Sequence, residues 1–182
     1  MITIIIIAVV VIILIYFIAT YNGLVNLKNK VKDGWAQIDV LLKRRNDLIP
    51  NLVETVKGYA KHEQSTLTEV INARNKAVNA GNKEEEMQAA SELTKALGNL
   101  FALSESYPDL KANTNFLDLQ NNLKETEDKI SYARQFYNDN VMAYKNKLEM
   151  FPSNIVASMF GFKPEAFFEA TSEEKETPKV QF

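Results

Sequence analysis

The pattern of apolar positions divides the chain into an N-terminal block and a longer amphipathic body. Residues 2–19 are strongly apolar and carry no charged side chain. At ~1.5 Å per helical residue, this block is long enough to cross a hydrocarbon core of about 30 Å. A cleavable signal would need a basic leading region and a small-x-small cleavage site, which Met1, Thr20 and Tyr21 do not supply. We therefore predict an uncleaved transmembrane helix.

Apolar residues beyond Gly23 recur at the three-and-four spacing of helices with one buried stripe. The first stripe comprises Leu24, Leu27, Val31, Trp35, Ile38 and Leu42. A second helical region covers residues 48–78, with Pro50 near its start, and we expect a kink or break at residues 58–64 because Gly58 weakens the helix. A third covers residues 83–104 and ends before Pro108, because the residue preceding a proline disfavours helical angles.

A fourth stripe is the longest and predicts a helix of about nine turns. It comprises Phe116, Leu119, Leu123, Thr126, Ile130, Ala133, Tyr137, Val141, Tyr144, Leu148 and Phe151. Thr114 offers an N-cap, Pro152 ends the helix, and a short apolar helix is expected at residues 154–159. Long helices joined by short turns pack as bundles. The predicted fold is all-α, with an N-terminal transmembrane helix followed by an antiparallel four-helix, coiled-coil-like bundle.

Three segments follow from this division. Residues 1–22 form the anchor, residues 23–163 form the helical bundle, and residues 164–182 form an acidic, proline-containing tail that we expect to be disordered. Lys28, Lys30 and Lys32 follow the span closely, which favours a single-pass protein of the cell membrane with a cytoplasmic helical domain. Asp33 weakens this charge bias, so a body on the outer side is the alternative.

Composition and motifs give no support for catalysis. The chain has no cysteine, one histidine and a formal net charge of −2. A thiolate site is therefore excluded, and binding to nucleic acid is not expected without a basic patch. His62 and Glu63 are not followed by a second histidine at metalloprotease spacing, and no phosphate loop or nucleophile elbow is present. We predict no enzyme activity, no catalytic residue, no metal, no cofactor and no small-molecule substrate.

Several polar residues interrupt the apolar pattern of the body and form a candidate polar network. They are Arg44, Arg45, Asp47, Asn51, Glu54, Arg74, Glu127, Arg134 and Asn138. The simpler interpretation is a solvated face with local helix pairs. The alternative is a buried network, in which the members must pair with one another and would specify the register of the bundle. The acidic run at residues 84–86 is expected in the first turn of a helix, where carboxylates meet the positive end of the helix dipole.

Aromatic residues divide into expected core members and a candidate interaction patch. Those expected in the core include Tyr132, Phe136, Tyr137, Tyr144 and Phe151. Phe160, Phe162, Phe167 and Phe168 lie beside turns and a charged tail and are expected to form an exposed apolar patch. This patch is the candidate contact for a protein partner or for the lipid bilayer.

Three long stretches carry a family resemblance. TYNGLVNLKNKVKDGWAQIDVLLKRRNDLIPNLVETVKGYAKHEQSTL, YPDLKANTNFLDLQNNLKETEDKISYARQFYNDNV and FPSNIVASMFGF resemble the LemA family of bacterial membrane proteins. The resemblance implies one N-terminal span and a four-helix, coiled-coil-like domain, and it supplies no catalytic residues. One type of relative acts in magnetosome membrane formation, so the resemblance also implies a role in membrane organisation as one alternative.

Three functional hypotheses follow. The first is a membrane-anchored scaffold that acts through binding or self-association of its helical bundle. The second is an adaptor to a membrane protease or envelope-stress system, with the acidic tail or the aromatic patch as its docking element. The third is an enzyme with an unrecognised site.

Overall fold

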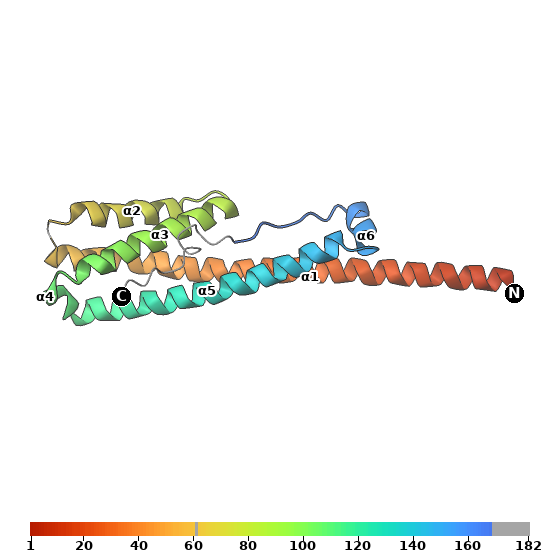
Figure 1. The fold of residues 1–182 in the computed structure, drawn as a ribbon, viewed down its shortest axis with the longest axis horizontal. Coiled ribbons are helices and arrows are strands. Elements are labelled where there is room, and N and C mark those ends of the chain that lie inside the picture. The colour runs from red at the N-terminus through yellow and green to blue at the C-terminus, as the bar shows by residue number, and fades with distance from the viewer. Residues whose placement is uncertain (61, 169–182) are drawn as a thin grey trace, which may run out of the picture. The chain divides into compact units, whose positions relative to one another are not determined.

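The computed structural model describes residues 1–60 and 62–168, and this part of the chain is all-α with no strand. The helices are α1 (Ile2–Tyr59), α2 (Gln64–Val78), α3 (Lys83–Ser104), α4 (Pro108–Lys111), α5 (Thr114–Glu149) and α6 (Ser153–Met159) (Figure 1). The predicted helical class and the apolar N-terminal helix are confirmed. The antiparallel arrangement and the segment boundaries at residues 22 and 163 stay predictions, and residues 169–182 of the predicted tail lie outside the described residues.

Helix α1 is one continuous helix of 58 residues that contains Pro50. The anchor, the first predicted stripe and the start of the second helical region therefore belong to a single element. The predicted break at residues 58–64 is confirmed, because α1 ends at Tyr59 and α2 begins at Gln64.

Pro50 lies inside α1 because a neighbouring helix replaces the hydrogen bond that proline removes. Proline has no N–H, so the carbonyl of Asn46, four residues earlier, loses its intrahelical donor. Asn46 is buried, which makes an unpaired carbonyl costly. The Nε of Arg74 in α2 donates to this carbonyl at 3.4 Å, so α2 supplies the missing donor.

The described chain forms two compact units. The first unit comprises residues 1–37 and 133–167, and the second comprises residues 38–132 together with Phe168. Each unit has buried apolar side chains from more than one helix.

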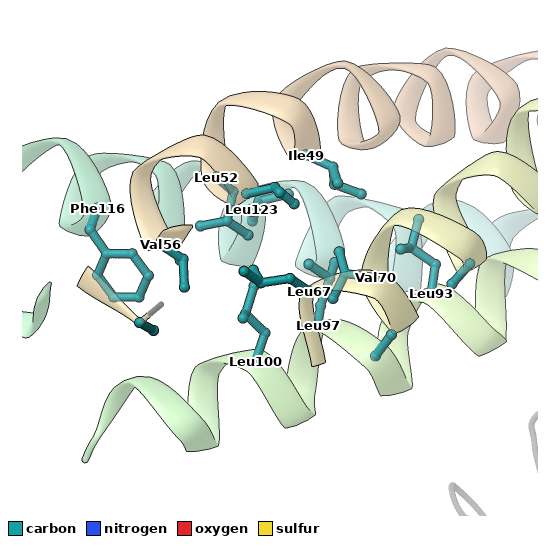
Figure 2. Close-up of a cluster of buried hydrophobic side chains, with 14 of the residues drawn as sticks. Ile49, Leu52, Val56, Leu67, Val70, Leu93, Leu97, Leu100, Phe116 and Leu123 are labelled. Atoms are coloured by element: carbon teal, nitrogen blue, oxygen red, sulfur yellow. The ribbon is translucent and has the colours of Figure 1, made fainter. Parts of the chain in front are cut away.

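Helices α1, α2, α3 and α5 supply most of the core of the second unit, and the short helix α4 adds Leu110. Its buried members are Ile49, Leu52, Val53 and Val56 of α1, Leu67, Val70 and Ala73 of α2, Leu93, Ala96, Leu97 and Leu100 of α3, Phe116 and Leu123 of α5, and Ala60 and Leu110. Figure 2 shows these side chains converging from the four helices. Helices α2 and α3 pack side by side (Figure 1). Parts of the second, third and fourth predicted stripes thus meet in this core.

In the first unit, α1 packs against α5 at a close approach. A Cβ on Gly34 would lie 3.3 Å from the Cα of Tyr137, so a larger residue there would push the helix backbones apart. Tyr137 is fully buried and stacks edge-on against Trp35, with ring centroids 5.6 Å apart. The stripe predicted for residues 24–42 is confirmed, because Leu24, Val31, Ile38 and Leu42 are all buried.

Two helix starts show how local sequence sets the boundaries. The Asn82 side chain accepts a hydrogen bond from Glu85 N at 2.9 Å, while the Glu85 carboxylate accepts from Gly81 N at 2.8 Å. This reciprocal cap places the acidic run in the first turn of α3, as predicted. At α5 the predicted cap by Thr114 is wrong, because Asn113 Oδ1 accepts from Phe116 N at 3.0 Å and Thr114 is already helical.

The hydrogen bond from Arg74 to Asn46 can be tested by a double-mutant cycle. Arg74→Met is expected to lower the free energy of unfolding by about 1 kcal/mol, because it removes the donor from a buried carbonyl. In a Pro50→Ala background the cost should fall by at least half, since the new alanine N–H reaches the same carbonyl. Denaturant unfolding of all four proteins measures the coupling. Equal costs in both backgrounds would contradict the compensation.

Candidate functional site

The candidate site is centred on a buried arginine in the second unit. Arg45 of α1 is only 1% exposed, and its guanidinium reaches two other helices. Its Nη1 donates to Glu127 Oε2 of α5 at 2.9 Å and to Thr94 Oγ1 of α3 at 2.9 Å. Its Nη2 donates to the carbonyl of Ala90 at 3.0 Å. One side chain thus joins α1, α3 and α5.

Thr94 completes this arrangement, which we call the Arg45 cluster (Arg45, Thr94 and Glu127). The Thr94 hydroxyl accepts from Arg45 and donates to Glu127 Oε1 at 2.9 Å. Both carboxylate oxygens of Glu127 are therefore hydrogen-bonded within the cluster. The sequence analysis did not select Thr94. A threonine one turn after Ala90, beside the buried positions of α3, could have indicated a polar group at the core.

The other predicted network residues do not join this cluster. Arg44, Asp47, Asn51 and Glu54 are exposed on α1, and Glu54 lies 3.8 Å from Lys57 in a surface pair. Arg74 is half-buried and donates a hydrogen bond to the Asn46 carbonyl. Arg134 and Asn138 are half-buried in α5 and belong to the first unit. Within the predicted network, Arg45 and Glu127 form an ion pair with a buried guanidinium.

Electrostatics give the Arg45 cluster a structural consequence. A guanidinium taken out of water loses several kcal/mol of hydration, which only a well-placed counter-ion and hydrogen bonds offset. The side chain of Glu127 is 33% exposed, so the pair is buried on the arginine side and reaches water on the glutamate side. A shift of any one of the three helices would leave the arginine charge without its partners. The cluster therefore favours a single register of these helices.

A groove of about 460 Å³ adjoins the exposed side of Glu127, between α3 and α5. We call it the α3–α5 groove, and its lining residues are Thr94, Leu97, Gly98, Phe101, Gln120, Asn121, Leu123, Lys124, Glu127 and Asp128. Phe101 is half-buried and supplies apolar contact surface at the groove, whereas Leu97 and Leu123 lie beneath it as buried core residues. The remaining large side chains of the lining are polar or charged. An apolar surface with polar groups around it is the composition of a binding site for a protein segment.

Gly98 leaves part of this groove open. A Cβ added there would meet no atom within 4 Å, so packing inside the chain does not require a glycine. A glycine in a helix interior costs about 1 kcal/mol relative to alanine. The missing side chain admits a close approach by a group from outside.

A second groove lies in the same unit, between the end of α1 and α2. Its volume is about 560 Å³, and its lining includes Val53, Glu54, Leu67 and Ile71. No member of the Arg45 cluster lines it. The two grooves therefore differ in that only the α3–α5 groove connects to a buried charge.

The predicted aromatic patch is found in part. Phe160 is exposed, and Phe162 and Phe167 are half-buried. The predicted exposure of Phe168 is wrong, because its side chain is 3% exposed. Among the aromatics predicted for the core, Tyr137 and Tyr144 are buried, whereas Tyr132, Phe136 and Phe151 are exposed. Phe151 is the clearest departure, and it is exposed because α5 ends at Glu149, before the stripe reaches it.

The first turn of α3 contains one carboxyl group with an altered acidity. Burial raises the pKa of Glu86 above its ordinary value of 4.5, and the nearby charge of Asp39 and a hydrogen bond with that residue raise it further. The two carboxyl groups thus favour a state with a proton between them. Among residues 1–60 and 62–168 no three histidine, aspartate or glutamate side chains are grouped to hold a metal ion.

The two partners of the buried ion pair should differ in their cost of removal. Glu127→Ala is expected to lower the free energy of unfolding by about 3 kcal/mol, because it leaves a buried guanidinium without its counter-ion. Arg45→Met should cost less, about 1 to 2 kcal/mol, because the partly exposed carboxylate is rehydrated. Lys129→Ala, which breaks an exposed pair with Glu125, is the control and should cost less than about 0.5 kcal/mol. The reverse order of the two cluster variants in urea unfolding would contradict the burial argument.

The raised pKa of Glu86 predicts a pH-dependent stability. Because the folded state favours the protonated carboxyl, the pKa of Glu86 is higher in the folded state than in the unfolded state. Its contribution to stability is therefore fully present below the unfolded pKa and is lost as the pH rises through the folded pKa. Glu86→Gln should therefore unfold at a higher temperature than the wild type at pH 7, with the difference vanishing near pH 4. Glu84→Gln removes an exposed carboxylate of the same turn and should give no gain. Calorimetric Tm values at both pH values measure the effect, and a wild-type advantage for Glu86 at pH 7 would contradict it.

Comparisons with known proteins give relatives that match most of the chain. Magnetosome protein MamQ 2 of Paramagnetospirillum magneticum is 26% identical over 183 positions, which cover 84% of this chain and 67% of the relative. Protein LemA of Metamycoplasma hominis is 26% identical over 160 positions, covering 87% and 73%. Magnetosome protein MamQ of Magnetospirillum gryphiswaldense is 24% identical over 191 positions, covering 88% and 70%.

A family model also matches most of the chain. It describes the LemA family and matches residues 34–182, which include the Arg45 cluster and the α3–α5 groove. One described helix of the chain, α1, is long and apolar enough to cross a membrane. These findings support a membrane-associated helical protein, and the chain belongs to the LemA family.

Proposed function

We propose that this chain is a membrane-anchored scaffold that binds a protein partner in its α3–α5 groove. The single observation that carries the proposal is the groove itself, with apolar residues inside it and the Arg45 cluster at its wall. The partner segment would present apolar side chains to Phe101 and to the open position at Gly98. The Arg45 cluster would hold α3 and α5 in the register that forms the groove.

Membrane attachment would come from residues 2–19 of α1. None of these residues is buried within residues 1–60 and 62–168, and they carry no charge. Their apolar side chains require a surrounding such as lipid. Lys28, Lys30 and Lys32 favour a cytoplasmic position of the helical body. The proposed protein thus presents its groove at the cytoplasmic side of the cell membrane.

The functional proposal is supported by structure and family rather than by catalytic geometry. Sequence and structure offer a groove with mixed polar walls, and the LemA and MamQ relatives are consistent with a membrane-associated role. A scaffold needs a rigid surface more than it needs reactive groups. The hydrogen-bonded contacts of Arg45 with two other helices would provide that rigidity.

Site-specific crosslinking tests the groove directly. A photoreactive amino acid at Gln120, which lines the groove, is expected to capture a partner when the full chain is expressed in its native membrane. Gly98→Leu fills the open position and should reduce the crosslinked yield at least ~10-fold, the loss typical of a blocked central contact. Gly58→Leu is the matched control, because Gly58 also lies in a helix with no atom within 4 Å of an added Cβ.

The outcomes separate the possible occupants. A partner that is lost in Gly98→Leu and kept in Gly58→Leu supports the proposal. An unchanged yield in Gly98→Leu would show that the groove is not the binding surface. Capture of a second copy of the chain would replace a separate partner with self-association.

A further inference from the structure

The first unit contains a sharp change in burial along α1. Residues 2–19 are exposed or half-buried, whereas Thr20 is 5% exposed and Leu24 is fully buried. From residue 2 to residue 20 the helix advances about 27 Å at ~1.5 Å per residue, close to the ~30 Å of a hydrocarbon core. The rest of the unit therefore begins to cover α1 where the predicted span ends.

Helix α6 and the turn after it lie against α1 at this level. The ring of Phe160 lies 4.7 Å from the ring of Tyr21, centroid to centroid, and Phe162 lies 5.7 Å from it. Lys28 Nζ lies 5.8 Å from the centroid of Phe162. Figure 1 shows α6 beside α1. If residues 2–19 span the bilayer, Tyr21 and Phe160 must lie in its interfacial region.

The outer face of this segment is apolar and uncovered. Val156 and Ala157 of α6 are buried against the unit. The large apolar side chains that are exposed on α6 and its flanks are Met150, Phe151, Ile155, Met159 and Phe160. Phe151 is 80% exposed and Met159 is 65% exposed, which is unusual for side chains of this size. The segment is therefore apolar on both its inner and its outer face.

The charge pattern agrees with a position at a lipid surface. Residues 150–162 contain no charged side chain, and Lys147 and Lys163 stand just before and after them. Glu149 is the nearby acid on the first side and lies 4.0 Å from Lys145, while Glu165 follows on the second. An apolar segment between lysines is the arrangement by which interfacial helices insert among headgroups.

We infer that residues 150–162, which we call the α6 segment, form a second membrane contact that inserts into the interfacial region of the bilayer spanned by α1. This inference rests on the membrane anchoring proposed above, and it is independent of the α3–α5 groove. The occupant of the exposed face is lipid, because the face is continuous through Phe160 and Tyr21 with the lipid-facing surface of residues 2–19. Two attachments fix the rotation of the first unit about the axis of α1, which a single span would leave free.

The absence of cysteine from the chain allows a clean test. Single cysteines are placed at Phe151 and Met159 of the full chain and labelled with an environment-sensitive fluorophore. The labelled proteins are reconstituted in vesicles of phosphatidylcholine and phosphatidylglycerol. We expect blue-shifted emission and at least ~5-fold stronger quenching by headgroup-level spin-labelled lipid than at Phe136→Cys.

Phe136 is a matched control in the same unit. It is also an exposed aromatic residue, and its ring lies 3.6 Å from a Cβ built on Gly34, which is about 20 Å beyond Thr20 along α1 at ~1.5 Å per residue. A label there should remain in water. Val10→Cys reports the span itself and should be quenched by spin labels deep in the acyl chains.

Each outcome decides the inference. Quenching at Phe151→Cys and Met159→Cys, but not at Phe136→Cys, supports it. Aqueous emission at both sites with Val10→Cys quenched would overturn the α6 contact and leave the span intact. Blue-shifted emission without quenching by lipid would show a protein cover and also overturn it. A Val10→Cys label that is not quenched would overturn both the span and the contact.

Discussion

Residues 2–19 impose the constraint on which the proposed organisation of this protein depends, because no part of the chain that the structure describes buries them. Each large apolar residue in this block contributes roughly −0.3 to −0.6 kcal/mol to membrane insertion, and the sum is about −5 kcal/mol or more favourable. The same helix continues to Tyr59 without a break, so it belongs both to the lipid-facing segment and to the packed body. Burial that begins at Thr20 marks the change between these environments. The proposed scaffold role uses this helix for both purposes.

Away from the lipid, the body depends on a polar interaction as well as on apolar stripes. Leucine-rich helix faces pack in several registers at similar cost, whereas a buried guanidinium tolerates only the register that brings its partners to it. Arg45, Thr94 and Glu127 provide such a selection in the second unit. Arg74 plays a related part by compensating the carbonyl freed by Pro50. Polar groups thus select one register among several helix packings that bury similar apolar surface.

The sequence predicted the helical class and the buried stripes, because a helix repeats its buried positions at fixed spacing. It correctly identified Leu24, Val31, Ile38 and Tyr137 as core, and it placed the break after Gly58. Periodicity could not show that Phe151 is exposed, because that depends on where α5 ends and what lies beside it. Periodicity did contain a signal that separates Arg45 from Arg44, because Arg45 lies three residues after Leu42 and four before Ile49 on the buried stripe. Thr94 was missed because a threonine is ordinary in a helix until its partners are known.

The most direct test of the account is extraction of the protein from native membranes at pH 11. Alkaline carbonate removes proteins held only by surface contacts and leaves spanning helices in place. We predict that the full chain stays in the membrane pellet and that a chain lacking residues 2–19 is released, even though it keeps the α6 segment. Release of the full chain would contradict a spanning anchor and with it the proposed organisation of the protein.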